Sequence, residues 1–351
     1  MRRLLLRFHL YAALIAGLFV VVLGVTGSIM AFEPELDHLF HPALFYVTPA
    51  ARTLSLAELA ASASKVFPGE RASSYVLATD PDLSWSLNFK SGAVFVNPYT
   101  GAVLGVRQGP TVLARIHQLH LRLLIRNASD TGKTIMSWAG VGMLALALSG
   151  LYLWWPQKRM TVKWRAAAPR VWFDVHNVSG IVSMLFLLLL SATGVAIGFD
   201  EQIVPLFYRA TASAPLATSV EVTPVPGATP LAPDRALAIA REALPGASPL
   251  IVGMPGPRTS YRIAARFPED RTPGGRSRIY IDQYTGRVLL VESSRTTAPG
   301  TRLVILNRAI HTGDLFGLPS KAVMSFASLM VVVQGISGAA IWWTRRPTRR
   351  R

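Results

Sequence analysis

The sequence predicts an α-helical membrane protein in which four transmembrane helices form two parallel repeats, each carrying an α+β domain outside the membrane. Three observations predict this fold. Hydrophobic residues make up 51% of the 351 residues and charged residues only 16%, against about 25% in soluble domains. Four apolar stretches are long enough to cross a bilayer, which takes about 20 helical residues. The second half of the chain also repeats the pattern of the first.

The apolar stretches cover residues 9–32, 134–155, 176–199 and 321–343. Three arginines precede the first stretch, as in a secretory signal. The stretch is nevertheless longer than the apolar core of a signal, about 7–15 residues, and no small-residue cleavage site follows it. We therefore expect an uncleaved membrane anchor.

The basic residues predict the orientation in the membrane. Lys and Arg number 36 against 19 Asp and Glu, and they gather before the first helix, in the second loop and at the end of the chain. Short flanking segments rich in Lys and Arg stay in the cytoplasm, so we expect both termini to be cytoplasmic in a bacterial inner membrane. In chain order, the predicted parts are the N-terminus with the first helix (1–32), a periplasmic domain (33–132), the second helix (133–155), a basic loop (156–172), the third helix (173–199), a second periplasmic domain (200–320), the fourth helix (321–343) and a basic tail (344–351).

Composition also excludes several kinds of chemistry. The basic residues flank apolar stretches instead of forming one patch, which argues against nucleic-acid binding. The chain has no cysteine, which excludes disulfides, thiolate metal sites, iron–sulfur clusters and covalently attached haem. Metal or redox chemistry would therefore depend on the seven histidines, on carboxylates or on a cofactor held without covalent bonds.

Each outer segment has the pattern of a small α+β domain. Ser55 and Glu58 have capping-box spacing and predict a helix that ends at Pro68-Gly69, and a second helix is predicted over about 234–244. A Tyr-Thr-Gly turn precedes the last predicted strand of each segment. The predicted strands are Ser84–Phe89, Ala93–Val96 and Ala102–Val106, then Tyr261–Phe267, Arg278–Asp282 and Arg287–Val291.

The internal repeat is the most informative pattern. Aligning the first and third helices on His9 and His176 also aligns the dipeptides Thr26-Gly27 and Thr193-Gly194. Aligning the second and fourth helices on their lysines matches further pairs: Ser149-Gly150 with Ser337-Gly338, and Trp154-Trp155 with Trp342-Trp343. Both copies would enter the membrane from the cytoplasm, so we expect a pseudo-twofold axis along the membrane normal.

This symmetry arranges the histidines in pairs. His9 and His176 are equivalent, so they lie at one depth on opposite sides of the axis. His120 precedes the second helix and His311 precedes the fourth, which makes them a second candidate pair. Two opposed neutral imidazoles are the axial ligands of a six-coordinate haem iron. Small residues that follow the first pair at helical spacing would leave room for a flat macrocycle: Ala12, Ala13, Ala16, Ser179, Gly180 and Ser183.

Other interpretations stay open at this point. Small residues in transmembrane helices commonly serve helix packing, and a histidine near a helix end can be only an interfacial side chain. Two histidines could also hold a transition metal, although Asp174 is the only carboxylate near His176 and none lies within a turn of His9.

The outer site offers a third histidine, His117, one helical turn before His120. Alignment of the following helices favours His120 as the partner of His311, because it needs the shorter gap. His117 is then the alternative ligand or a group at the haem edge. Three arginines flank these histidines and either neutralise haem propionates or are ordinary surface charges: Arg115, Arg122 and Arg308.

Three motifs carry a family resemblance: the paired Tyr-Thr-Gly turns, the run Ser-Gly-Leu-Tyr-Leu-Trp-Trp-Pro at 149–156, and His-Gln-Leu-His at 117–120. With them, nearly the whole chain resembles the PepSY-associated transmembrane family, which includes bacterial iron-regulated membrane proteins and ferric-siderophore reductases. The resemblance implies four helices, two outer PepSY-like domains and, as in the reductases, two b-type haems near the two membrane faces. The second repeat departs from the pattern, because Ile-His-Thr-Gly at 310–313 has one histidine where the first repeat has two.

The sequence thus predicts a cytochrome with two haem b groups, one ligated by His9 and His176, the other by His311 with His120 or else His117. Electrons would pass from a quinol or a cytoplasmic flavoprotein to a periplasmic ferric siderophore or other ferric chelate, which makes the protein a ferric-chelate reductase. A second hypothesis is a membrane-anchored PepSY-domain protein without redox function that binds peptides or regulates proteases. A metal transporter is a third, but the four stretches lack charged residues at mid-depth.

Overall fold

The computed structural model describes residues 1–125, 129–217 and 219–344. The predicted basic tail therefore lies outside the described residues from position 345 onward. The contacts divide the chain into two units. A helical unit contains Met1–Glu33, Thr111–Phe207 and Leu306–Arg351, and a sheet unit contains Pro34–Pro110 and Tyr208–Ile305.

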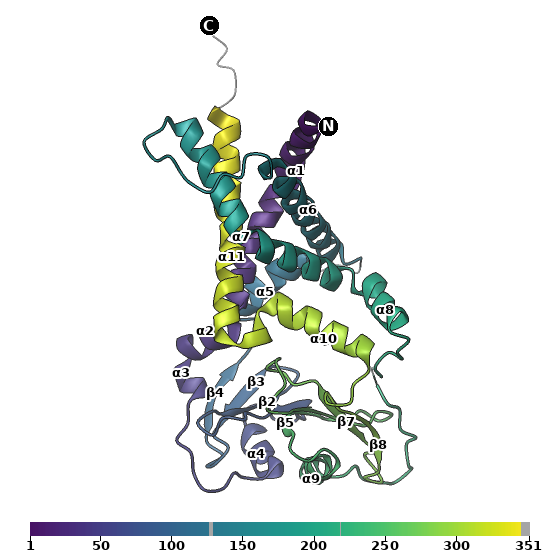
Figure 1. Ribbon diagram of the computed structural model, residues 1–351. Coiled ribbons are helices and arrows are strands. Elements are labelled where there is room, and N and C mark those ends of the chain that lie inside the picture. The colour runs from purple at the N-terminus through teal and green to yellow at the C-terminus, as the bar shows by residue number, and fades with distance from the viewer. Residues whose placement is uncertain (126–128, 218, 345–351) are drawn as a thin grey trace. The chain divides into compact units, whose positions relative to one another are not determined.

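Four helices of the helical unit are long and apolar enough to cross a membrane, which confirms the four predicted spans: α1 (Arg2–Met30), α6 (Thr131–Trp154), α7 (Ala168–Gly198) and α11 (Leu318–Thr344). They pack in a ring in the order α1–α6–α7–α11, and neighbours in the ring run in opposite directions (Figure 1). The helices α1 and α7 therefore lie on one diagonal and run in the same direction.

Two of these helices begin earlier than the sequence predicts. α1 begins at Arg2, ahead of the apolar stretch predicted from residue 9, and α7 begins at Ala168, ahead of the helix predicted from residue 173. His9 and His176 therefore lie about two turns inside their helices. The first turns of the two helices, which precede the histidines, carry basic side chains: Arg2 and Arg3 on α1, and Arg170 on α7.

Small residues allow α1 and α11 to approach closely. The Ser328 hydroxyl donates a hydrogen bond to the Gly24 carbonyl oxygen at 2.9 Å. A Cβ atom on Gly24 would lie only 2.7 Å from the Ser328 carbonyl oxygen and 3.0 Å from Val331. Val331 also packs with Val20 and Leu187 in the apolar centre of the bundle.

In the sequence, shorter helices precede or follow the long ones: α2 (Glu33–Phe40), α3 (Pro42–Phe45), α5 (Val112–Arg122), α8 (Asp200–Ala210) and α10 (Pro299–Thr312). α5 packs against α1 and α6, and the Thr111 hydroxyl caps its first turn. α10 ends where Gly313, at φ 77°, turns the chain toward α11. The outer domains predicted over 33–132 and 200–320 include α5 and the end of α10, but the contacts of these helices group them with the helical unit.

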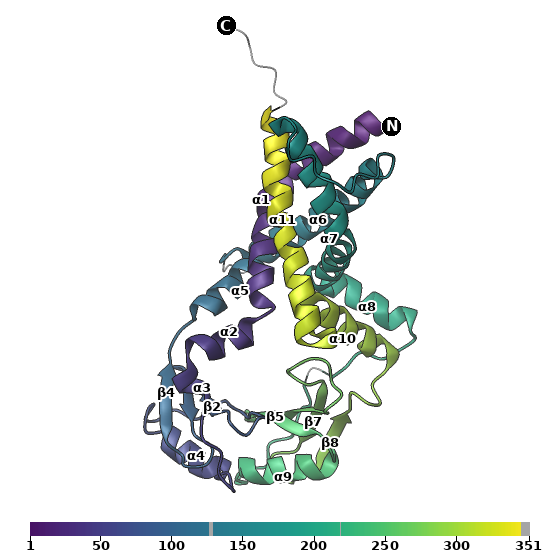
Figure 2. The ribbon, with the colours of Figure 1, turned by 60° about the vertical axis from the view of Figure 1, so that its left-hand side comes forward.

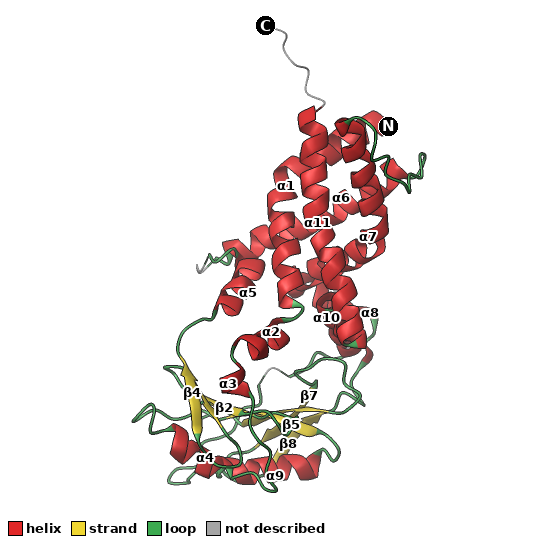
Figure 3. Cartoon of the chain, turned by 90° about the vertical axis from the view of Figure 1, so that its left-hand side faces the viewer, coloured by secondary structure: helices red, strands yellow, loops and turns green. Residues whose placement is uncertain are grey.

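The sheet unit is built on one antiparallel sheet of eight strands in the order β4-β3-β2-β1-β5-β6-β7-β8 (Figure 2). The strands are β1 (Ser74–Val76), β2 (Trp85–Asn88), β3 (Ala93–Val96), β4 (Val103–Arg107), β5 (Ser248–Gly253), β6 (Tyr261–Arg266), β7 (Ser277–Ile281) and β8 (Val288–Glu292). Two helices, α4 (Leu56–Ala63) and α9 (Pro233–Ala243), cover one face and form the core with it (Figure 3). The capping box of Ser55 and Glu58 is present at the start of α4.

The two expected outer domains share this sheet. β1 and β5, which the sequence analysis did not predict, are the strands that join them, with Tyr75 opposite Val252. Across the same junction, the Asp234 carboxylate of α9 accepts hydrogen bonds from the first two backbone amides of α4 at 2.7 and 3.0 Å. Neither strand shows the alternation of apolar and polar residues that predicts a strand. β1 has only three residues, and β5 contains Pro249 beside a register shift.

We expect Gly24→Ala to lower the thermal midpoint of the purified protein, because the added methyl group would push α1 away from Ser328. Gly17 of the same helix is the matched control, since nothing lies within 4 Å of a Cβ atom there. A Gly-to-Ala change in a helix interior otherwise stabilises by about 0.5–1 kcal/mol. Circular dichroism during heating in one detergent compares the two variants. Equal stability of both variants would contradict the close contact between α1 and α11.

Candidate functional site

Four histidines of the helical unit form two close pairs. The ring centres of His9 on α1 and His176 on α7 are 6.4 Å apart, and the rings are nearly perpendicular at 88°. His120 in the last turn of α5 and His311 in the last turn of α10 have ring centres 6.5 Å apart and planes at 56°. The structure therefore brings together the partners that the repeat predicts.

The two pairs lie near opposite ends of the bundle. His120 contacts Thr26, which follows His9 by 17 residues along α1, or about 25 Å of helix. His311 contacts Thr193, which follows His176 on α7 by the same number of residues. Because the hydrocarbon core of a bilayer is about 30 Å thick, one pair lies near each face of the membrane that these helices would cross.

Each imidazole is hydrogen-bonded through Nδ1 to a hydroxyl group of a neighbouring helix. In every case, the hydroxyl belongs to the same half of the chain as the histidine, whereas the facing imidazole belongs to the other half. The four contacts are His9 to Ser149 Oγ at 2.8 Å, His176 to Ser337 Oγ at 3.0 Å, His120 to Thr26 Oγ1 at 2.8 Å, and His311 to Thr193 Oγ1 at 3.0 Å.

These hydroxyls determine the tautomer of the imidazoles. Each hydroxyl lies 2.6 Å from the carbonyl oxygen four residues earlier in its own helix and donates its hydrogen there. A hydroxyl has one hydrogen, so its oxygen must accept the bond from the imidazole. Nδ1 therefore carries the proton in all four rings, and Nε2 keeps a lone pair that can bind a metal.

A glycine follows each of the four hydroxyl residues, and the imidazole lies against it. A Cβ atom on Gly27 or Gly194 would approach the histidine Cε1 atom at 3.2 or 3.0 Å, closer than most van der Waals contacts. The corresponding distances at Gly150 and Gly338 are 3.4 and 3.6 Å. The Ser/Thr-Gly dipeptide thus supplies both a hydrogen-bond acceptor and the space for the ring.

Burial keeps the histidines of α5 and α10 neutral. Loss of hydration, together with the neighbouring His311 and His117, lowers the pKa of His120 to about 3. Loss of hydration likewise lowers the pKa of His311 to about 4. Both side chains are therefore neutral at pH 7, which is the form that binds metals.

His117 has a different partner. Its Nδ1 atom lies 2.9 Å from a carboxylate oxygen of Glu33, and both side chains are about one-third exposed. Of the flanking arginines, Arg122 pairs with Asp130, whereas Arg115 and Arg308 are exposed.

The spacing of the pairs suits two axial ligands of one metal ion. Imidazole nitrogen binds metal ions at about 2 Å, which puts the centres of two opposed rings roughly 6 Å apart. No group of three or more His, Cys, Asp or Glu side chains is placed to hold a metal ion in the part of the chain that the structure describes. Two imidazoles leave the remaining coordination positions of an octahedral ion to a planar tetradentate ligand, such as a porphyrin.

The four hydroxyl residues were not assigned a role by the sequence analysis: Thr26, Ser149, Thr193 and Ser337. A pattern for them was nevertheless present, because a Ser-Gly or Thr-Gly dipeptide occurs in all four spans and corresponds between the two halves. The sequence separations between histidine and hydroxyl range from 94 to 161 residues, so only the fold reveals which hydroxyl meets which ring.

Comparison with known proteins agrees with the fold and with the motifs. The profile of the family described as the PepSY-associated TM region matches residues 6–345. No curated protein sequence matches the chain.

The tautomers can be measured directly. In cofactor-free protein labelled with ¹⁵N-histidine, we expect the Nδ1-protonated form for His9, His120, His176 and His311. In Thr26→Val, His120 should be a mixture of the Nδ1-protonated and Nε2-protonated tautomers, because valine has the same shape as threonine but accepts no hydrogen bond. Thr26→Ser is the matched control and should preserve the single form. A single tautomer for His120 in the valine variant would show that the hydroxyl does not determine it.

Proposed function

The chain belongs to the PepSY-associated TM region family, and we propose that it is a b-type cytochrome that carries electrons across a bacterial inner membrane. The observation that carries this proposal is the pair of facing imidazoles at each end of the bundle, each with Nδ1 bonded to a hydroxyl. A haem b bound at each pair would supply a one-electron carrier, whose iron alternates between the ferric and ferrous states.

The protein's own contribution is to orient the ligands. Bonds of Nδ1 to Ser149 and Ser337 at one site, and to Thr26 and Thr193 at the other, fix the ring orientation before a metal arrives. Such outer contacts typically change metal affinity by about 10- to 100-fold. Each haem would have one axial ligand from each half of the chain, so haem binding would also hold the two halves together.

Two sites are needed to cross the membrane. About 25 Å of helix separates the two histidine pairs, and the interior between them is packed with apolar side chains such as Val20, Leu187 and Val331. A centre near each face would shorten the distance that an electron must travel. This arrangement supports transfer across the bilayer more than storage at one face.

The basic flanking segments support an orientation with both termini in the cytoplasm. His9 and His176 would then form the inner site, and His120 and His311 the outer site. Electrons would enter from a quinol or a cytoplasmic flavoprotein and leave in the periplasm.

We propose a ferric siderophore or another ferric chelate as the acceptor, which would make the protein a ferric-chelate reductase. This choice follows the resemblance to ferric-siderophore reductases. One electron converts ferric to ferrous iron, and hard oxygen ligands bind the ferrous ion less tightly because it carries less charge. His117 and Glu33, both partly exposed near the outer pair, lie where such an acceptor could approach.

The haem content of alanine variants tests the ligand assignment. We expect His9→Ala and His176→Ala to lose the same haem, because each variant removes one of the two imidazoles that would hold it. His120→Ala and His311→Ala should lose the other haem, so each variant falls from two haems per chain to one. His117→Ala is the matched control and should keep both. Loss of haem in His117→Ala with retention in His120→Ala would show that His117 is the outer ligand and that the assignment of His120 is wrong.

Electron delivery across a membrane tests the activity. In vesicles that contain the protein and an internal quinol, we expect a ferric chelate added outside to be reduced. His176→Ala and His311→Ala should each lower the rate to that of protein-free vesicles, because either variant interrupts the path. The rate is followed with a coloured ferrous chelator. Undiminished reduction in both variants would exclude the two-site path.

A further inference from the structure

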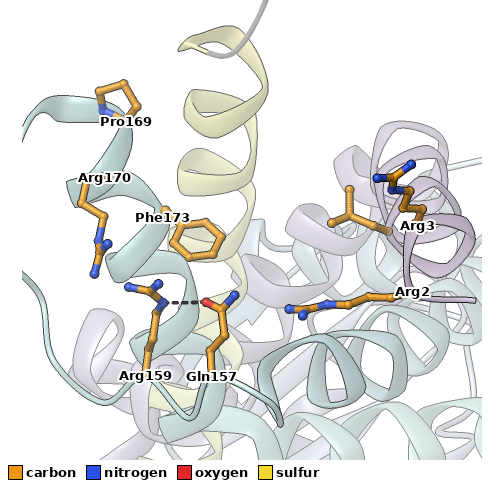
Figure 4. A pocket seen from close by; sticks show the side chains of 8 residues that line it. Arg2, Arg3, Gln157, Arg159, Pro169, Arg170 and Phe173 are labelled. Atoms are coloured by element: carbon orange, nitrogen blue, oxygen red, sulfur yellow. Dashed lines mark hydrogen bonds between the residues drawn. The ribbon is translucent and has the colours of Figure 1, made fainter.

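A cavity of about 780 Å³ opens at the end of the bundle where α1 and α7 begin (Figure 4). Its wall combines positive charge with apolar surface. Its lining includes Arg2, Arg3, Leu6, Arg159, Arg170 and Phe173.

Most residues that line the cavity lie on α1 and α7, the two helices that carry the inner histidine pair. Leu6 and Arg2 precede His9 by three and seven residues, so they lie on the same face of α1. Phe173 has the same relation to His176 on α7. Seven residues correspond to about 10 Å of helix, so the arginines at the mouth of the cavity are about two turns beyond the imidazoles.

Acidic side chains do not neutralise the cavity. Asp174 is the only carboxylate within residues 1–32 and 133–199, and it is fully buried. Its oxygens accept hydrogen bonds from Nε of Arg170 at 2.9 Å and from Arg159 at 3.3 Å. This leaves a net positive charge on the wall.

Two of the arginines retain free donors. Within the described ranges, no hydrogen bond or ion pair involves the Arg3 guanidinium, and the bonds of Arg170 use only Nε. These two residues also occupy equivalent positions, because the alignment of His9 with His176 places Arg3 on Arg170. The two halves of the chain therefore present two guanidinium groups toward one space.

We propose that this cavity binds the two carboxylates of the inner haem, one at Arg3 and the other at Arg170; this inference rests on the proposed function. Haem b has two propionate groups at one edge, and an unpaired carboxylate is costly to bury in an apolar bundle. The cavity offers both groups a charge-assisted hydrogen bond with access to water. The same edge would be the one that faces the cytoplasmic electron donor.

Orientation in the membrane alone would not explain the cavity. Basic residues that follow the positive-inside rule need only be exposed at the surface, as Arg7 is on the same helix. Arg7 does not line the cavity, which makes it a matched control for loss of a charge.

Redox potentiometry of the purified, haem-loaded protein tests the proposal. We expect Arg3→Gln to shift the midpoint potential of the inner haem to a more negative value, because loss of a neighbouring cation favours the ferric form. The outer haem should not shift. Arg3→Lys should restore most of the wild-type potential, and Arg7→Gln should change neither haem. Arg170→Gln should act as Arg3→Gln does, provided that the unchanged outer haem shows that the protein is folded.

Haem dimethyl ester, in which both carboxylates are blocked, supplies a second measurement. Protein produced under haem limitation should bind haem b at the inner site roughly 10- to 100-fold more tightly than the ester, as expected for lost charge-assisted hydrogen bonds. In Arg3→Gln this preference should be smaller. If Arg3→Gln keeps the wild-type preference for haem b over the ester, Arg3 does not contact a carboxylate and the proposal is overturned.

The outcomes separate this proposal from the proposed function. Bound haem with potentials and ester preference unchanged in both Arg3→Gln and Arg170→Gln would overturn the cavity assignment and leave the cytochrome in place. If these variants only slow reduction by an added donor protein, the cavity is a docking site and the assignment is again wrong. Protein that binds no haem in any form would overturn the proposed function itself.

Discussion

The arrangement of the helical unit depends on one recurring interaction, the hydrogen bond from a histidine Nδ1 to a hydroxyl whose hydrogen is already donated to its own helix. It occurs four times with residues from four long helices and two short ones. Because the hydroxyl can only accept, each ring is held in one tautomer. The following glycine then allows the ring to lie against the helix backbone. Each of the four rings therefore keeps the lone pair of its Nε2 atom, the atom through which a neutral imidazole can bind a metal.

The same interaction explains why α5 and the end of α10 group with the long helices. Each short helix ends just after its histidine and precedes α6 or α11 in the sequence. Through Thr26 and Thr193, these short helices are tied to α1 and α7, the two helices that also carry the inner histidines. Both sites are therefore built on the same diagonal pair of helices, and their spacing is set by helix length.

Much of this organisation can be predicted from the sequence, because it depends on local patterns. Apolar length predicts the four spans. The internal repeat predicts that His9 faces His176, and it favours His120 over His117 as the partner of His311. The hydroxyl partners and the β1–β5 junction were not predictable in the same way. They depend on contacts between residues far apart in the chain. Nothing in the sequence around Tyr75 or around Val252 indicates that these two residues pair in one sheet. The early starts of α1 and α7 were missed because arginines lower the hydropathy there, although Arg2 and Arg3 are helical.

The central claim is that two haems are bound by paired histidines, and the visible spectrum of the purified protein tests it most directly. A reduced-minus-oxidised spectrum after expression with sufficient haem should show low-spin b-type bands, and the pyridine haemochrome should give two haems per chain. A colourless protein under the same conditions would contradict the account and favour a membrane-anchored domain without redox function.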